Sequence, residues 1–433
     1  MNKFFKKFLK KISLCFNFSF ISFIDGHEYL DKSDLSKIRS FIGSNKFDNT
    51  KEFERRFTKL IGDGEAISFA SARMGFYEFM RISGIKEDDE IILCGSTCSV
   101  MPNAVKRLGA KPIYSDIDTN TFGSCPNSIN ESITSKTRLV VAQHSFGIPC
   151  QIDEIKKICT MKNILLVEDC ALSVGSKLNN RKVGTFGDAA IFSTDHTKPI
   201  NSIIGGFIYS ENQEIINKLK KCQESAKPIL VEKQKAIFSQ LKIEWMLARK
   251  RRYGILKIFN SLMFIFNSFF NKPSPFLDED ADLNFENSTY PYPAKLPEFI
   301  AILGLHELDK WDQKKVSRKV SFNKYLEELS KSNLKNFIPG AYYDNNRENM
   351  PLRFVFSHPQ GNLIRKSLER LVDVEEIWFT KPIINTKSSL HDFNYKNGTC
   401  KLSEKYGNGM INLPLFNKTK LEDKIIITLL EKV

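Results

Sequence analysis

Residues 192–206 read FSTDHTKPINSIIGG, and they place Lys198 in a short polar link between two apolar runs. The run DAAIF (188–192) leads into the link, and the run FIYS (207–210) follows it. Both runs are typical of buried β-strands. Because ammonium groups are almost never fully buried, a surface turn is the simplest interpretation of a lysine in such a link. The neighbouring sequence decides whether Lys198 has a chemical role.

Short apolar runs alternate with helical patterns from residue 67 to about residue 210. The runs are EIILC, KPIYSDI, RLVVAQ, ILLVED, AAIFS and GGFIYS. Helical patterns such as SVMPNAVKRLG (99–109) and QIDEIKKICTMKN (151–163) separate them. Strands that are apolar throughout and alternate with helices predict a largely parallel sheet covered on both faces. The sequence therefore predicts an α/β fold with a large, mostly parallel sheet.

The length of 433 residues is enough for two lobes of unequal size. We expect a basic amphipathic amino-terminal segment (1–30), a large α/β domain (31–225), a basic and aromatic insert with a loop (226–295), and a long helix followed by a smaller α/β domain (296–433). The long helix is predicted over 296–329, where apolar residues recur at a spacing of three to four.

The formal net charge is +14, and much of it is concentrated in two segments, 1–11 and 248–272. Both mix basic residues with phenylalanine and leucine, and the chain carries no recognisable nucleic-acid-binding motif. This mixture predicts contact of residues 1–24 and 248–272 with a membrane surface, or packing of the two segments on the protein itself or on a partner subunit. Neither apolar run is a convincing membrane span, since residues 12–24 are too few and residues 253–270 are interrupted by Lys257, Asn260 and Asn267. We expect no nucleic-acid partner.

The nine cysteines are scattered and odd in number, which indicates a reducing compartment, and we expect a cytoplasmic protein. Cys94 and Cys98 lack a second cysteine pair and a nearby histidine, so no zinc site is predicted there.

Two charged residues are expected to emerge close together at the sheet edge. ILLVED ends with Glu168 and Asp169, and AAIFS ends with Ser193 and leads to Lys198. Ligands of parallel sheets collect at the carboxyl ends of the strands. A lysine between apolar walls is a usable amine nucleophile, and Gly205–Gly206 lets the backbone approach a ligand closely. A buried ion pair between Asp169 and Lys198 explains this spacing as well as covalent chemistry does.

The segment FSTDHTK with its following GG, EDCA (168–171) and KVGTFGD (182–188) closely resembles the sugar aminotransferases of the DegT/DnrJ/EryC1/StrS group. Further matching segments follow in the same order: KEFERRFTKLIG (51–62), FASARMGFYEFM (69–80), TCSVMPNAVKRLGAKPIYSDID (97–118), QHSFGIPCQIDEI (143–155), LPEFIAILGLHELDKW (296–311) and INLPLF (411–416). The resemblance implies the aspartate-aminotransferase-like (type I) fold, pyridoxal 5′-phosphate (PLP) as cofactor and a homodimer.

The resemblance also implies roles for individual residues. Lys198 matches the lysine that binds the cofactor covalently, and Asp169 matches the carboxylate that faces the pyridine nitrogen. An anion there keeps that nitrogen protonated. Ser193 matches a phosphate-binding serine. The turn that holds the phosphate at a helix N-terminus matches Ser71, Ala72 and Arg73.

Two histidines are expected near the substrate or behind the residues that touch it. His144 matches a family histidine, although a hydrogen-bonded core histidine explains its position equally well. His196 lies two residues before Lys198.

The chain departs from the family pattern at four positions. Arg73 replaces a threonine in the phosphate turn, and Cys98 replaces the aromatic residue that stacks on the cofactor. Leu172 replaces a glutamine or histidine after the EDxA pattern. Pro293 replaces the asparagine that a neighbouring subunit offers to the phosphate.

The resemblance predicts an aminotransferase that moves an amino group from glutamate or glutamine to a nucleotide-linked keto sugar, for surface polysaccharide or glycan biosynthesis. A PLP-dependent sugar dehydratase is one alternative. The related dehydratases have a histidine in place of the lysine, so Lys198 opposes this alternative, while His196 keeps it open. A non-catalytic, membrane-associated relative is the other alternative, favoured by the four departures and opposed by the pair Lys198 and Asp169.

Overall fold

The computed structural model describes residues 3–249, 251–269, 274, 276–277, 283, 288–386 and 388–432. The end of the predicted basic insert (270–272) and most of the acidic loop (278–282 and 284–287) lie outside the described residues. The helices are α1 Lys3–Cys15, α2 Lys32–Ser40, α3 Asp48–Ile61, α4 Ala72–Ile82, α5 Val100–Lys106, α6 Pro126–Ser132, α7 Ile152–Met161, α8 Gln213–Ser225, α9 Val231–Leu247, α10 Tyr253–Phe269, α11 Glu298–Ser330, α12 Gly361–Leu368, α13 Lys401–Gly409 and α14 Thr419–Leu430.

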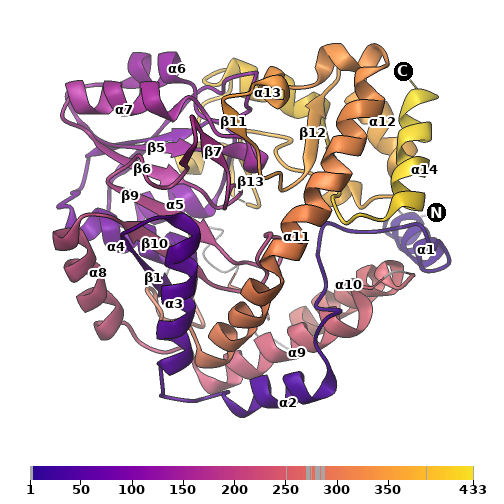
Figure 1. Cartoon of the computed structure of the whole chain (residues 1–433), viewed down its shortest axis with the longest axis horizontal. Helices are drawn as coiled ribbons and strands as arrows, with labels where there is room; N and C mark the ends of the chain where they lie inside the picture. Colours follow the sequence, from indigo (N-terminus) through magenta and orange to yellow (C-terminus); the bar gives the residue numbers. More distant parts are fainter. Residues whose placement is uncertain are drawn as a thin grey trace.

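A seven-stranded sheet forms the centre of the larger part of the molecule (Figure 1). Its strands, in spatial order, are β1 Glu65–Phe69, β10 Gly206–Ser210, β9 Ala189–Ser193, β6 Leu165–Asp169, β5 Thr137–Gln143, β2 Glu90–Cys94 and β4 Lys111–Ser115. β10 runs antiparallel to both of its neighbours, and every other pairing within the sheet is parallel. The prediction of a mostly parallel sheet is therefore confirmed.

Helices cover both faces of this sheet, as the apolar strands predicted. Alternate residues of one strand enter different cores, because successive side chains point to opposite faces. Ile91 and Leu93 of β2 join the core on which α4, α5 and α8 pack, whereas Ile92 joins a separate core with α6 and α7. In Figure 1, α6 and α7 lie on one side of the sheet and α8 on the other.

The long helix α11 connects the two parts of the molecule (Figure 1). It occupies 298–330, close to the predicted 296–329. Its first half packs on α3, where a Cβ at Gly304 would come within 2.2 Å of the Phe53 ring, and its second half packs near α14. The smaller α/β part contains an antiparallel pair, β12 Phe354–Ser357 and β14 Met410–Leu413, covered by α12, α13 and α14. The domain boundaries expected from the sequence stay a prediction.

Short strands and 3-10 turns complete the described secondary structure. They are β3 Thr97–Cys98 paired with β13 Ile383–Ile384, the group β7 Lys177–Leu178, β8 Arg181–Lys182 and β11 Arg347–Glu348, and the 3-10 turns η1 Ser145–Gly147, η4 Asn333–Phe337, η5 Gly340–Tyr343, η6 Val374–Glu376 and η7 Leu390–Phe393. The β3–β13 pair is parallel and ties residues near the sheet edge to the carboxy-terminal region.

The two basic segments pack against each other as the antiparallel helices α1 and α10 (Figure 1). A Cβ at Gly254 would come within 2.2 Å of the carbonyl oxygen of Leu14, so glycine permits this close approach. The Lys257 ammonium lies 2.7 Å from Asp373, which ties α10 to the smaller part of the molecule. After α1, Ile21 exchanges backbone hydrogen bonds of 2.9 Å with Leu371 and Asp373. Both segments therefore pack on the protein itself.

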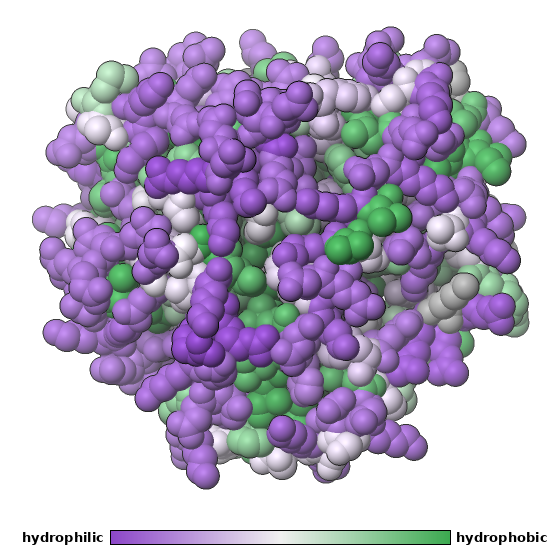
Figure 2. Space-filling model, in the orientation of Figure 1, coloured by the Kyte–Doolittle hydropathy of each residue, from purple (hydrophilic) through white to green (hydrophobic). Residues whose placement is uncertain are grey.

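Hydrophilic side chains cover most of the face shown in Figure 2, and hydrophobic residues show there in separate areas. Among the helices of the described residues, none is both long enough and apolar enough to cross a bilayer.

Candidate active site

The parallel strands of the large sheet end at one edge, and a cavity lies there. β5, β6 and β9 end at this edge with Gln143, Asp169 and Ser193. β10 runs the other way and begins there with Gly206, and Ser71 lies just beyond the end of β1. The cavity has a volume of about 350 Å³, within the range of roughly 300–1,000 Å³ that small-molecule sites occupy.

The cavity brings together most of the residues predicted for the site. Of the predicted residues, it is lined by Ala72, Arg73, Cys98, Asp169, Leu172, Ser193, His196 and Lys198. Ser71 is not among the lining residues but caps the N-terminus of α4 directly before Ala72. His144 is completely buried outside the cavity.

Asp169 and Lys198 face the same cavity and act on each other electrostatically. Burial raises the pKa of Asp169, while the Ala171 amide, 3.0 Å from Oδ1, and the Lys198 charge act to lower it. Burial lowers the pKa of Lys198, and the carboxylate of Asp195 is the strongest opposing influence. A lysine whose ammonium form is disfavoured offers a free amine for attack on a carbonyl.

The start of α4 has the features of an anion cradle. The Oγ atom of Ser71 is buried, and no described residue hydrogen-bonds to it. An unsatisfied buried hydroxyl costs about 1–3 kcal/mol, which a ligand oxygen would remove. A Cβ at Gly206 would lie 2.3 Å from the backbone nitrogen of Ala72, so only glycine lets β10 begin against this helix end. Together with Ser193, these groups fit a phosphate at a helix N-terminus.

The four departures from the family pattern lie in or near this cavity. Arg73 lines it and donates a hydrogen bond to the carbonyl of Leu277, which also lines it. Cys98 belongs to β3, and its sulfur lies 3.5 Å from the side-chain nitrogen of Asn385. Leu172 is buried in the wall, whereas Pro293 is half-buried and is not a lining residue.

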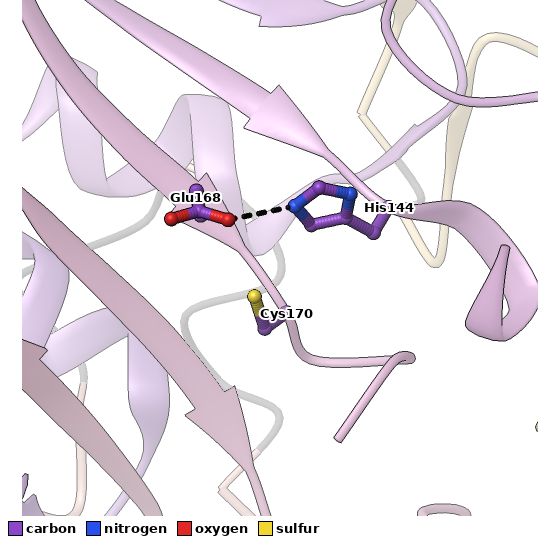
Figure 3. Close-up of side chains that lie close together, drawn as sticks. All are labelled: His144, Glu168 and Cys170. Carbon is purple, nitrogen blue, oxygen red and sulfur yellow. Dashed lines mark hydrogen bonds and ion pairs between the residues drawn. The ribbon is translucent and has the colours of Figure 1, made fainter. Parts of the chain in front are cut away.

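His144, Glu168 and Cys170 form a compact group behind the cavity (Figure 3). The Nε2 atom of His144 lies 3.0 Å from Glu168, and its Nδ1 atom accepts the backbone N–H of Cys150. The two Glu168 oxygens also accept backbone N–H groups of residues 184, 186 and 187. With four hydrogen bonds, the carboxylate has no lone pair left for a metal ion.

His144 therefore occupies the position of a hydrogen-bonded core histidine, the alternative that its sequence left open. Because Nδ1 accepts a hydrogen bond and Nε2 faces Glu168, the ring is the neutral tautomer protonated at Nε2. The group His144, Glu168 and Cys170 fixes the end of β6 and thus the direction of the Asp169 carboxylate.

Several lining residues were not predicted from the sequence. Gln143 ends β5 and donates hydrogen bonds to Ser96 and Ser145. Glu376 and Trp378 come from the carboxy-terminal region, and the Trp378 ring centroid lies 4.3 Å from the Nζ atom of Lys198. The only sequence pattern that marks these two residues is an acidic pair before a tryptophan, in VDVEEIWFTKP. Nothing in this pattern relates them to Lys198.

Residues 29–240 and 276–430 match the DegT/DnrJ/EryC1/StrS aminotransferase family. The chain belongs to this family. GDP-perosamine synthase of Escherichia coli O157:H7 is 30% identical over 192 residues, which is 44% of this chain and 50% of that protein. GDP-perosamine synthase of Vibrio cholerae is 31% identical over 166 residues, 38% of this chain and 45% of that protein. The chain thus spans about half the length of the curated relatives it matches.

Solved structures of aminotransferases share the fold over almost the whole chain. An aminotransferase from Psychrobacter cryohalolentis aligns with a TM-score of 0.70 at 15% identity, covering 94% of this chain and 98% of that chain. Helicobacter pylori PseC, an aminotransferase of pseudoaminic acid biosynthesis, aligns with a TM-score of 0.69 at 18% identity, covering 95% and 98%. The aspartate-aminotransferase-like fold implied by the resemblance is confirmed.

Proposed function

We propose that the protein is a PLP-dependent aminotransferase that moves an amino group from glutamate or glutamine to a nucleotide-linked keto sugar. The observation that carries the proposal is the meeting of Lys198 and Asp169 in one cavity, at the carboxyl edge of the sheet and beside the anion cradle of α4. PLP, when bound, supplies an electron-withdrawing ring that takes up the electron pair of the substrate carbon.

The residues of this chain would hold and serve that ring as follows. The Lys198 amine would hold the cofactor through its carbonyl carbon, and as a free amine it would move a proton to and from the substrate carbon. The Asp169 carboxylate keeps the pyridine nitrogen protonated. Ser71, Ser193 and the N-terminal amides of α4 hold the phosphate, and Arg73, which also lines the cavity, adds a positive charge.

A sugar substrate is supported by the family and by the relatives, two of which are GDP-perosamine synthases. A third, SpsC of Bacillus subtilis, is named for spore coat polysaccharide biosynthesis, which supports a role in surface polysaccharide or glycan formation. Lys198 in the cavity argues against a dehydratase, and its combination with Asp169 and an unsatisfied Ser71 hydroxyl argues against a non-catalytic relative.

The proposal includes a homodimer in the cytoplasm, since the family resemblance implies a site built across two subunits. All nine cysteines are free thiols, which fits a reducing compartment. Light scattering of the purified protein at several concentrations would measure the dimer, and a monomer that carries full activity would contradict it.

We further propose peripheral membrane contact through α1 and α10. Leu9 is exposed on α1 and Phe16 directly after it, and Ile255 and Leu262, spaced by seven residues, are exposed on one face of α10. Arg251 and Arg252 are exposed beside them. Co-sedimentation with anionic vesicles should fall for the double variant Ile255→Asp, Leu262→Asp and stay unchanged for Val316→Asp on α11. Equal sedimentation of both variants would contradict this contact.

A spectrum tests the catalytic proposal. The protein with PLP should absorb at the edge of the visible range, and borohydride should attach the cofactor permanently to the peptide that contains Lys198. Lys198→Ala should lose this attachment, and Lys182→Ala, outside the cavity, should keep it. Product analysis with glutamate and a nucleotide-linked keto sugar then separates amination from dehydration. Absence of attachment in the unaltered protein would show the non-catalytic alternative.

A further inference from the structure

His196 lies in the cavity wall with one ring nitrogen pointing away from water. Its ring packs edge-on against Phe276, with the ring centroids 4.6 Å apart. The Nδ1 atom is buried, and within the described part of the chain it makes no hydrogen bond. A carboxylate oxygen, Oε1 of Glu244, lies 3.6 Å from it.

Glu244 is a completely buried carboxylate near the end of α9. Its Oε1 atom accepts a hydrogen bond of 3.0 Å from Gln240, while its Oε2 atom has no partner among the described residues. A buried carboxylate without a full set of partners is costly, and so is a buried N–H without an acceptor. A small movement of either side chain joins the two groups in a charge-assisted hydrogen bond, which removes both costs.

The other ring nitrogen of His196 faces a second carboxylate. Its Nε2 atom lies 3.6 Å from Oδ1 of Asp195, whose side chain is 41% exposed. Asp195 in turn lines the same cavity as Lys198, and its backbone carbonyl accepts the Lys198 N–H at 2.9 Å. Glu244, His196 and Asp195 are thus successive neighbours, and Asp195 lies beside Lys198 in the chain and in the cavity.

We propose that His196, oriented by Glu244, carries protons to and from Lys198 by way of Asp195. The Lys198 ammonium gives one proton to the Asp195 carboxylate, which leaves a neutral amine. Asp195 passes the proton to Nε2 of neutral His196, whose Nδ1–H is directed at Glu244. The imidazolium, held between two carboxylates, releases the proton to water and returns to the neutral form, so the net change is one proton moved from Lys198 to the solvent.

This inference rests on the proposed function, because only a covalent role of Lys198 requires its proton to leave. It also goes beyond the family resemblance, since Glu244 lies between the two matched ranges, 29–240 and 276–430. His196 acts on Lys198 through Asp195, and Glu244 acts through His196, so both are positioning or relay residues.

The rate of borohydride-trapped PLP attachment to Lys198 tests the relay. His196→Asn should slow attachment by about 10², and added imidazole should restore much of the rate. Glu244→Gln should slow it by about tenfold, and Glu244→Asp should recover part of the loss. Glu422→Gln is the matched control, because Glu422 is also buried with an unsatisfied Oε2 but accepts a hydrogen bond from Ser321 instead of facing His196.

The outcomes separate the relay from the function on which it rests. If the unaltered protein attaches no PLP, the proposed function fails. If it attaches PLP while His196→Asn keeps the rate within twofold, or is slow but gains nothing from imidazole, the relay is overturned and the function stands. His196→Gln carries the same test should His196→Asn fail to fold, and thermal unfolding of each variant reports folding.

Discussion

The Nζ atom of Lys198 lies 4.3 Å from the ring centroid of Trp378, so the carboxy-terminal region covers the lysine that follows β9. The guanidinium carbon of Arg353, a buried residue, also lies 4.3 Å from the centroid of this ring. A desolvated cation over an indole face is stabilised by about 2 kcal/mol. Trp378 therefore links the cavity to the smaller part of the molecule through two cations.

Trp378→Ala should release PLP about tenfold faster than the unaltered protein, because water then reaches Lys198; a tenfold change corresponds to about 1.4 kcal/mol. Trp378→Phe keeps an aromatic face over the amine and should lose little. Loss of the cofactor absorbance after rapid dilution measures the release. Equal release rates for the alanine and phenylalanine variants would show that the ring does not protect the lysine.

Ser71→Ala should weaken PLP binding without destabilising the protein that lacks PLP. The Ser71 hydroxyl makes no hydrogen bond that the described structure could lose. Its removal should therefore leave the free energy of unfolding of the protein without PLP unchanged or increase it. Loss of one phosphate contact should raise the Kd for PLP by about tenfold. Ser173→Ala is the control, since its hydroxyl is also buried and unsatisfied but does not belong to the anion cradle at the start of α4. The same change in Kd for both variants would contradict a phosphate contact at Ser71.

Asp169→Asn should retain PLP attachment at Lys198 but lower kcat by about 10²–10³. The amide keeps the size of the side chain and loses the negative charge that holds a proton on the ring nitrogen. Rapid-mixing spectra with glutamate alone measure this half of the reaction without a sugar substrate. A variant with nearly normal kcat would show that Asp169 does not face the cofactor ring.

The stability of the protein should fall in acid because of Glu307 on α11. Burial alone would raise the pKa of Glu307, but the Lys314 ammonium and the His27 side chain lower it to about 2. A carboxyl with a lowered pKa stabilises the folded state at pH values above its usual range near 4.5, and this contribution is lost as pH falls toward 2. The contribution amounts to about 3 kcal/mol.

Glu307→Gln should remove this dependence, which urea unfolding measures at neutral pH and at several pH values between the ordinary and the lowered pKa of Glu307. Glu307 also accepts the backbone N–H of Asn201, 3.0 Å away, in the loop that follows Lys198. The glutamine variant should therefore bind PLP less tightly as well as unfold more easily. If the free energy of unfolding falls equally with pH in the unaltered and variant proteins, the assignment to Glu307 is contradicted.

Local patterns predicted the sheet and the pair Asp169 and Lys198, because strand ends of a parallel sheet meet at one edge. They did not predict Trp378 or Glu244, whose positions depend on how distant segments pack. They also left His144 undecided, since a buried polar residue at a strand end has the same pattern whether it faces a cavity or a core. The pairing of α1 with α10 depends on the close approach at Gly254, which neither segment indicates by itself.

The backbone hydrogen bonds of Ile21 with Leu371 and Asp373 have a practical consequence. Ile21 precedes the matched family range, which begins at residue 29, yet its partners lie shortly before Trp378. A protein trimmed to the matched range would lose these hydrogen bonds. The segment around Trp378, which covers Lys198, would then be held less firmly. Recombinant versions intended for crystallisation or assay therefore need the first residues intact, with any affinity tag added beyond them rather than in their place.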